Sequence, residues 1–334
     1  MFSSIIFLLK KILSISYHLK EIHLNKIDIV GLGEVVIDWV AELPYYPSPD
    51  EKIDALSENY FPGGVTANFL VAVSRLGGSC GFIGAVGDDF YADLLIDDFK
   101  RENIDTSLTI KIEDKTTPIN FIMIVKGEKS IIQSPHMQTT KITISDLDEL
   151  YIGNARVLHT TLIHQKITEK AIEIAKEFDV RVTIDLEAQI ALRGWQVLKD
   201  VLLSADIVIP NKKGATTITN TKSPQQAAKI LVKKGIPIVI ITLGKEGVLI
   251  TTKEFQKKIP AYEVKKVIDT TGAGDSFNGA FSYGYWIKGW NIEKACKYAN
   301  AAAALKIQKL GARTGMPYQS EVLQFLREID INWD

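Results

Sequence analysis

Residues 269–279 read DTTGAGDSFNG, a turn of small residues that separates an apolar run from a helical pattern. The preceding run, residues 264–268, is rich in β-type residues and predicts a strand. Gly272, Ala273 and Gly274 then lie where that strand turns into a helix. Small residues let the backbone approach a ligand, and the N–H groups and dipole of a helix start favour an anion. The stretch therefore predicts an anion-binding turn.

Asp275 lies within the first turn of the predicted helix. A carboxylate repels a bound phosphate, but it can accept the proton of an attacking hydroxyl, as aspartates do in other phosphoryl transferases. The alternative is that Asp275 only complements the helix dipole. Spacing alone supports the two interpretations equally.

The composition limits the classes of partner. The chain has 334 residues, a net charge of -1 and 46% hydrophobic residues, so no global field draws it to nucleic acid or a membrane. A small-molecule ligand is the expectation. Cys80 and Cys296 stand alone, without disulfide or zinc spacing, which favours a reducing compartment such as the cytoplasm.

Residues 1–25 precede the regular pattern. Their apolar run, residues 5–9, is too short to span a bilayer and is followed by Lys10 and Lys11. We expect an N-terminal extension, either an added amphipathic helix or the result of a start codon assigned too early, and no membrane anchor or secretory signal.

From residue 26 to about residue 330, strands and helices alternate with short connections. This alternation predicts one α/β domain with a mainly parallel central sheet covered by helices on both faces, a three-layer sandwich. The expected strands are 27–33, 80–86, 157–160, 180–185, 205–209 and 238–243, and the expected helices are 65–76, 90–101 with Asp88 as N-cap, 168–177, 223–234, 273–287 and 292–309.

Two segments, within 35–60 and 117–135, interrupt the alternation. The second predicts two strands, 119–125 and 130–133, around a turn at Gly127. Together the segments predict a small antiparallel β lid that closes over the substrate and excludes water. Apolar residues on both faces of the lid also favour pairing with the lid of a second subunit.

The sequence DTTGAGDSFNGAF, residues 269–281, resembles the C-terminal signature of the ribokinase/PfkB carbohydrate kinases, and the resemblance extends over residues 26–325. It implies a ribokinase-like fold and transfer of the γ-phosphoryl group of ATP to a sugar hydroxyl. It also implies that Asp275 is the catalytic base and that the backbone of residues 272–274 is the anion hole.

Further motifs extend this resemblance. PGGVTAN at 62–68 resembles the N-terminal signature, and GEVVID at 33–38 resembles the first strand of fructokinase-like members. The implied substrate-binding residues are Asp38, Gly63, Gly64 and Asn68. Taken alone, this signature would be only a glycine turn with Asn68 bonded locally. The implied ATP-binding residues are Asn211, Thr242, Gly244, Gly247 and Asn300.

Three positions depart from the family pattern. Family members carry Asn-x-x-Glu where this chain has Asn211 and Gly214, which leaves the implied Mg²⁺ dependence open. Asp185 and Glu187 are no obvious substitute, because they follow a different strand. Asp269 and Gly311 match a monovalent-cation site, whereas Lys306 and Gly315 replace small and hydroxyl residues, so activation by potassium is also open.

Several other functions share part of this pattern. A nucleoside kinase has the same signatures, and a non-catalytic sugar-binding homologue would keep the fold. A kinase for acidic sugars such as 2-keto-3-deoxygluconate should carry a lid arginine, but residues 117–137 contain only Lys126 and Lys129 as strong cations. A neutral, fructose- or ribose-like sugar is therefore favoured. The pattern GLG at 31–33 lacks the third glycine of a dinucleotide fold, and no P-loop occurs.

Overall fold

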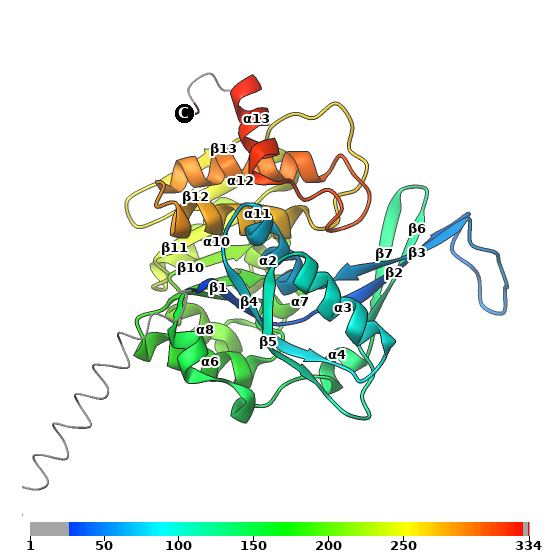
Figure 1. The fold of residues 1–334 in the computed structure, drawn as a ribbon. Coiled ribbons are helices and arrows are strands. Elements are labelled where there is room, and N and C mark those ends of the chain that lie inside the picture. The colour runs from blue at the N-terminus through cyan, green and yellow to red at the C-terminus, as the bar shows by residue number, and fades with distance from the viewer. Residues whose placement is uncertain (1–26, 330–332, 334) are drawn as a thin grey trace, which may run out of the picture.

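The computed structural model describes residues 27–329 and residue 333. The expected N-terminal extension, residues 1–25, lies outside the described residues. The described part folds around one large sheet, with a smaller sheet beside it (Figure 1). No described helix is both long enough and apolar enough to cross a membrane.

The large sheet is mainly parallel, as predicted. Its nine strands are β1 (Ile27–Leu32), β4 (Cys80–Val86), β5 (Ile104–Lys111), β8 (Ala155–Thr160), β9 (Arg181–Leu186), β10 (Ile207–Pro210), β11 (Ile238–Thr242), β12 (Val248–Thr251) and β13 (Gln256–Ile259). They lie in the order β13-β12-β11-β10-β9-β8-β1-β4-β5. The pairs from β5 to β11 are parallel, and β12 and β13 run antiparallel at one edge.

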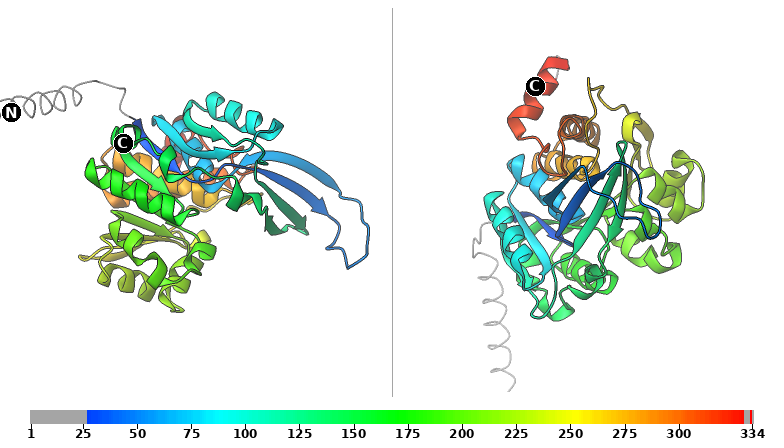
Figure 2. Two further views of the ribbon diagram at one scale, coloured as in Figure 1. Left: turned by 90° about the horizontal axis from the view of Figure 1, so that it is seen from below. Right: turned by 90° about the vertical axis from the view of Figure 1, so that its right-hand side faces the viewer.

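Helices cover both faces of this sheet. They are α2 (Val65–Arg75), α3 (Phe90–Arg101), α4 (His136–Thr139), α5 (Glu149–Gly153), α6 (Gln165–Glu177), α7 (Ala188–Ala191), α8 (Trp195–Ser204), α9 (Lys212–Thr219), α10 (Pro224–Lys233), α11 (Ala273–Ser282), α12 (Ile292–Lys306) and α13 (Gln319–Ile329). Successive strand side chains point to opposite faces. Val30 of β1 packs on the side of α6 and α8, whereas Ile29 packs on the side of α2 and α3. Figures 1 and 2 show the resulting three layers.

The lid is a separate sheet that extends sideways from the main body (Figure 2). It consists of β2 (Val36–Leu43), β3 (Ser57–Gly63), β6 (Ile119–Val125) and β7 (Glu128–Gln133), in the order β3-β2-β6-β7. The prediction of an antiparallel lid was wrong in one respect, because β2 pairs with β6 in parallel. The chain enters β2 and β6 from the main sheet in the same direction, so the lid is mixed.

Two local predictions also need correction. The N-cap of α3 is Asp89 and not Asp88, because the Asp89 carboxylate accepts hydrogen bonds from the backbone of Ala92 and of Thr117. Residues 264–268 are not a strand. The main sheet ends at β13, and the N–H of Ile268 donates instead to the carbonyl oxygen of Ile307.

The helical pattern that begins at Ala273 changes its geometry along its length. It is an α-helix only to Ser282, and residues 283–287 form a π-helical turn. The first part packs closely against α2, and a Cβ atom built on Gly279 would lie 2.6 Å from Cβ of Ala72 and 2.8 Å from the carbonyl oxygen of Phe69. This contact brings the N-terminal turns of α2 and α11 together above the sheet.

Glycine-to-alanine substitutions at Gly279 and Gly274 should therefore have different effects. Gly279→Ala forces α11 away from α2, and we expect a loss of about 1–3 kcal/mol in the free energy of unfolding. Gly274→Ala adds the same methyl group to the same helix, where no atom lies within 4 Å, so it should not lower stability. Denaturant unfolding of the two variants is the measurement, and equal stabilities would contradict this close contact.

Candidate active site

A cleft of about 290 Å³ lies beyond the carboxyl ends of the central strands, bounded by α2, α11 and the lid. Strand order reverses between β1 and β8, the point where open parallel sheets bind ligands. The residues lining the cleft are mostly polar: Glu34, Asp38, Gly64, Val65, Asn68, Asn120, Ile122, Lys129, Ile131, Gln133, Met137, Glu187, Gln189, Thr271, Gly272 and Asp275. Asp275, Gly272, Asp38, Gly64 and Asn68, which the sequence indicated, thus lie around one space.

Asp275 stands in the first turn of α11 and faces this cleft. Its Oδ2 accepts a hydrogen bond of 2.8 Å from Nδ2 of Asn68 on α2. Burial raises the pKa of Asp275 to about 7, the Asn68 hydrogen bond opposes that rise, and the charge of Glu187 adds to it. A carboxyl group with this pKa can accept a proton near neutral pH.

Arg313 holds the side chain of Asn68 in place, although no motif in the sequence points to this arginine. Its buried guanidinium donates from Nε to Oδ1 of Asn68 at 2.8 Å, and from another nitrogen to the carbonyl oxygen of Gly63 at 2.8 Å. It also forms an ion pair with Asp98. Both ends of the Asn68 amide are therefore engaged, and the amide is held so that its nitrogen points at Asp275.

Residues 272–274 form the predicted turn at the start of α11. Gly272 is the N-cap and has a positive φ of 76°, a conformation that residues with side chains rarely adopt. A Cβ atom there would also lie 2.7 Å from the carbonyl oxygen of Ala312. The first N–H groups of a helix have no partner within the helix itself, and in this turn the N–H of Ala273 donates back to the carbonyl oxygen of Thr270 at 3.2 Å. The turn therefore presents the start of a helix to the cleft, a position that favours an anion.

The lid brings two charged side chains to the cleft. Asp38 on β2 accepts a hydrogen bond of 3.0 Å from Asn120 on β6, and burial raises its pKa. A Cβ atom on Gly63 would collide with the Asp38 carboxylate, so this glycine makes room for it. Lys129 on β7 donates from Nζ to Oγ1 of Thr271 at 2.9 Å, so it bridges the lid and the 269–279 motif. The sequence alone predicts no role for Lys129.

Glu34 and Glu187 add acidic groups that we had not predicted as site residues. Glu34 accepts hydrogen bonds from the N–H of Val65 and from Thr161, and burial together with the charge of Glu187 raises its pKa to about 7. Burial also raises the pKa of Glu187. The Asp185 carboxylate, whose pKa is raised well above its usual value by burial and by Glu187, accepts a hydrogen bond from Asn278.

The structure explains the glycine at position 214. The side-chain oxygen of Asn211 accepts a hydrogen bond of 2.6 Å from the N–H of Gly214, and a Cβ atom at 214 would collide with the carbonyl oxygen of Leu186. No side chain fits at this position. Asp185 and Glu187 do belong to a different strand end, that of β9, as the sequence indicated, but this end is adjacent to the carboxyl end of β10.

The predicted nucleotide-binding residues gather in one region outside this cleft. Asn211 and Thr242 form an isolated parallel bridge at the ends of β10 and β11. Gly244 and Gly247 follow β11, and the position of a Cβ on Gly247 lies against residues 259–261. In the same stretch, Asn300 of α12 donates from Nδ2 to the carbonyl oxygen of Pro260 at 2.8 Å.

Asp269 and Gly311 also lie together. The Asp269 carboxylate accepts hydrogen bonds from the N–H of Thr271 at 2.8 Å and of Gly311 at 2.9 Å. Burial alone would raise the pKa of Asp269, but these bonds and the charge of Lys306 lower it. Burial lowers the pKa of Lys306 to about 8, although its contacts with Asp269 oppose the change, so Lys306 is charged at neutral pH.

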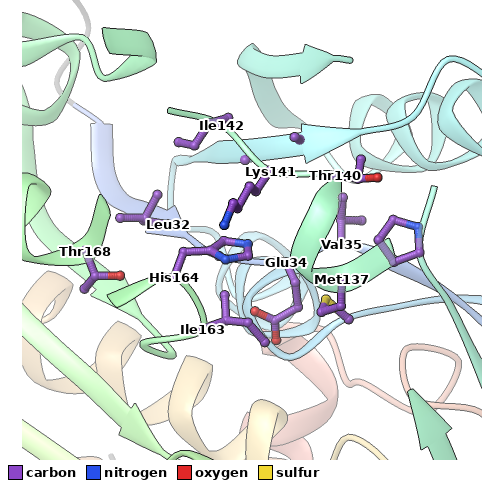
Figure 3. Close-up of a pocket in the computed structure, with 14 residues that line it drawn as sticks. Leu32, Glu34, Val35, Met137, Thr140, Lys141, Ile142, Ile163, His164 and Thr168 are labelled. Atoms are coloured by element: carbon purple, nitrogen blue, oxygen red, sulfur yellow. The ribbon is translucent and has the colours of Figure 1, made fainter. Parts of the chain in front are cut away.

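A second hollow shares Glu34 and Met137 with the cleft but is much smaller. Figure 3 shows its lining, which includes Val35, Met137, Ile163 and His164. Its volume is about 10 Å³, the lower limit for a single water molecule. It is a packing void behind the cleft. Among the described residues, no group of three His, Cys, Asp or Glu side chains is arranged to hold a metal ion.

Comparison with known proteins identifies the family. The family model described as pfkB family carbohydrate kinase matches residues 26–319. A ribokinase from Haemophilus influenzae is 31% identical over 310 residues, which cover 88% of this chain and 97% of that protein. The crystal structure of a ribokinase from Thermotoga maritima has a TM-score of 0.76 and 29% identity, and the match covers 90% of this chain and 99% of the other.

A structure from E. coli described as a ribokinase II candidate contains ATP and Mg²⁺. Its TM-score is 0.79 at 23% identity, with 90% of this chain and 99% of that chain covered. At this identity the match supports the fold alone.

Removing the Asn68 amide should raise the pKa of Asp275. The hydrogen bond from Asn68 stabilises the charged carboxylate, so Asn68→Ala favours the protonated form and moves the titration above about 7. Asn120→Ala is the matched control, because its amide bonds Asp38 instead and should raise the pKa of Asp38. NMR titration of isotope-labelled aspartates measures both, and an unmoved Asp275 in Asn68→Ala contradicts the contact.

Proposed function

Because the chain belongs to the pfkB family of carbohydrate kinases, ATP-dependent phosphotransferases, we propose that it phosphorylates a hydroxyl of a small neutral sugar. The observation that carries the proposal is the position of Asp275. It stands beside the anion-binding turn of α11 and shares one cleft with Asp38 and Asn68.

Asp275 acts as the general base. It accepts the proton of the sugar hydroxyl while the hydroxyl oxygen forms a bond to the γ-phosphorus of ATP, and the bond from that phosphorus to ADP breaks. Its pKa of about 7 makes it an acceptor at neutral pH. Asn68 and Arg313 restrict the Asp275 carboxylate to one orientation. Less conformational entropy is then lost when the carboxylate and the sugar hydroxyl align for the reaction.

The charge on the transferred phosphoryl group is stabilised by two features. The backbone of residues 272–274 at the start of α11 is the proposed anion hole, and Lys129 supplies a positive charge from the lid. Because Lys129 lies on β7, this charge is in place when the lid is closed. Closure excludes water, which would otherwise accept the phosphoryl group and waste ATP.

The cleft favours a neutral sugar over an acidic one. Asp38, Glu34 and Glu187 offer hydrogen-bond acceptors for hydroxyls and would repel a carboxylate, so an acid such as 2-keto-3-deoxygluconate is disfavoured. The described lining contains no aromatic side chain on which a base could stack, which disfavours a nucleoside. The ribokinase relative supports a ribose-like substrate, with a fructose-like sugar as the alternative.

ATP is assigned to the region of Asn211, Thr242, Gly244, Gly247 and Asn300. Mg²⁺ usually binds through one or two carboxylates, water and the phosphates of its nucleotide, and neutralises phosphate charge when bound. Glu187 fits this role, because it faces the cleft with Asp275 and follows β9, the strand next to the one that precedes Gly214.

We assign the kinase domain to residues 26–330. The two buried cysteines are unpaired, so we assign the protein to the cytoplasm.

The outer face of the lid supports a homodimer. Trp39, Tyr60 and Phe121 form an aromatic cluster there, with ring centroids 5.5–6.4 Å apart, and about half of the surface of Tyr60 is exposed. Pairing of two lids would remove this surface from water. Light scattering should find a dimer, and Phe121→Lys should shift it towards the monomer. A monomeric wild-type protein at working concentration contradicts the proposal.

Replacement of Asp275 by asparagine should abolish phosphoryl transfer and leave ATP binding intact. The amide cannot accept the proton, so we expect turnover to fall by roughly 100-fold or more. The fold should not suffer. Because the pKa of Asp275 is raised in the folded state, its ionisation opposes folding, and stability falls as pH rises through about 7. Asp275→Asn should therefore melt no lower than wild type at pH 8.

The assay measures ADP formation with a panel of sugars and nucleosides, and calorimetry measures ATP binding. Asp38→Ala is the comparison variant, and it should raise KM for the sugar while ATP affinity stays unchanged. Lys129→Met should lower kcat with little change in sugar affinity. Wild-type turnover by Asp275→Asn would refute the base assignment, and wild-type protein inactive on every compound would refute the proposed function.

A further inference from the structure

Lys306 is a charged side chain buried in full behind the anion-binding turn. It is the last residue of α12, and its side chain has no exposed surface. Lysine is almost never completely buried without a partner, because an ammonium group loses its hydration there. The ammonium group of Lys306 therefore needs polar protein atoms in place of its hydrating water molecules.

The ammonium group contacts two oxygens of Asp269. Nζ of Lys306 donates to the carbonyl oxygen of Asp269 at 2.8 Å and lies 3.9 Å from its Oδ2. The same carboxylate accepts the N–H groups of Thr271 and Gly311. One charge pair thus joins the end of α12, the turn at 269–272 and the loop that contains Gly311.

These three segments pack too closely to move independently. The N–H of Ile268 donates to the carbonyl oxygen of Ile307 at 2.8 Å, and Gly272 approaches the carbonyl oxygen of Ala312. A Cβ atom on Gly315 would collide with the carbonyl oxygen of Lys306. The bond from Lys306 to the Asp269 carbonyl fixes the peptide plane that leads into the turn.

A monovalent metal ion does not fit here beside Lys306. Such an ion would use the carbonyl and carboxylate oxygens of Asp269. The ammonium group already donates a hydrogen bond to that carbonyl oxygen and lies next to the carboxylate. The two like charges would repel each other strongly away from water. A lysine and a bound potassium ion would carry the same charge, so one can stand in for the other.

We propose that the Lys306 ammonium group is a built-in monocation that holds the 269–272 turn in its anion-binding shape, so that the enzyme works without a bound monovalent metal ion. Lys306 is a positioning residue, because it acts through the backbone of Asp269. The catalytic readout of this proposal rests on the proposed sugar-kinase function, whereas its stability readout does not.

The first test uses the wild-type protein and needs no variant to fold. Melting temperature and turnover are measured in potassium, sodium and choline chloride at matched ionic strength. We expect the same values in all three salts. Higher activity or stability in potassium alone would overturn the proposal. If no sugar is phosphorylated, the melting temperatures still test the cation while the proposed function fails separately.

The second test compares two substitutions at position 306. Lys306→Ala opens a cavity lined by the Asp269 oxygens, and in choline chloride turnover should fall by about 10- to 100-fold, as expected for misplacement of the turn. Potassium should restore both turnover and melting temperature. Lys306→Met fills the same space without charge, so potassium should not restore it. Lys309→Ala, at a neighbouring exposed lysine, controls for general salt effects.

The substitutions at position 306 distinguish a replaced cation from a general effect of salt. Rescue of Lys306→Ala by potassium, but not by choline, with no rescue of Lys306→Met, supports a replaced cation. Full activity of Lys306→Ala in choline chloride overturns the proposal, because the charge would then be unnecessary. An equal response of Lys306→Ala and Lys309→Ala to potassium also overturns it, because the effect would be one of ionic strength.

Discussion

The Asp275 carboxylate stands in the first turn of α11 and is buried in a cleft that other carboxylates share. The N–H groups at the start of α11 favour negative charge, but Glu187 and Asp38 crowd the same cleft with further carboxylates. Burial, and after it the charges of Glu187 and Asp38, raise the pKa of Asp275 to about 7. A general base works best when its pKa lies near the operating pH, and a pKa of about 7 meets this condition at neutral pH.

Three cationic side chains balance this acidic cleft from three different elements. Arg313, from the loop after α12, orients Asn68 against Asp275, and Lys306 supports the anion turn from behind. Lys129 reaches Thr271 from the lid. The first two charges are buried and belong to the rigid body of the protein. The third lies on the lid sheet, so its distance from the 269–279 motif depends on the position of the lid.

Close backbone contacts, more than side-chain chemistry, shape the remainder of the site. Gly272 lies against Ala312, Gly63 leaves room for Asp38, and Gly214 lies against Leu186. At position 214 the carbonyl oxygen of Leu186 occupies the space that a side chain would need. A side chain cannot enter there, and the nearest acidic group facing the cleft, Glu187, comes from the adjacent strand.

The sequence by itself determined the features that depend on short-range pattern: the α/β alternation, the turn at 272–274, and the pairing of Asp275 with that turn. Only the tertiary structure decided the parallel pairing of β2 with β6, the absence of a strand at 264–268, and the role of Arg313. The physical reason is separation along the chain. Periodicity and capping act over a few residues, whereas Arg313 meets Asn68 across 245 residues, and no local pattern encodes such a contact.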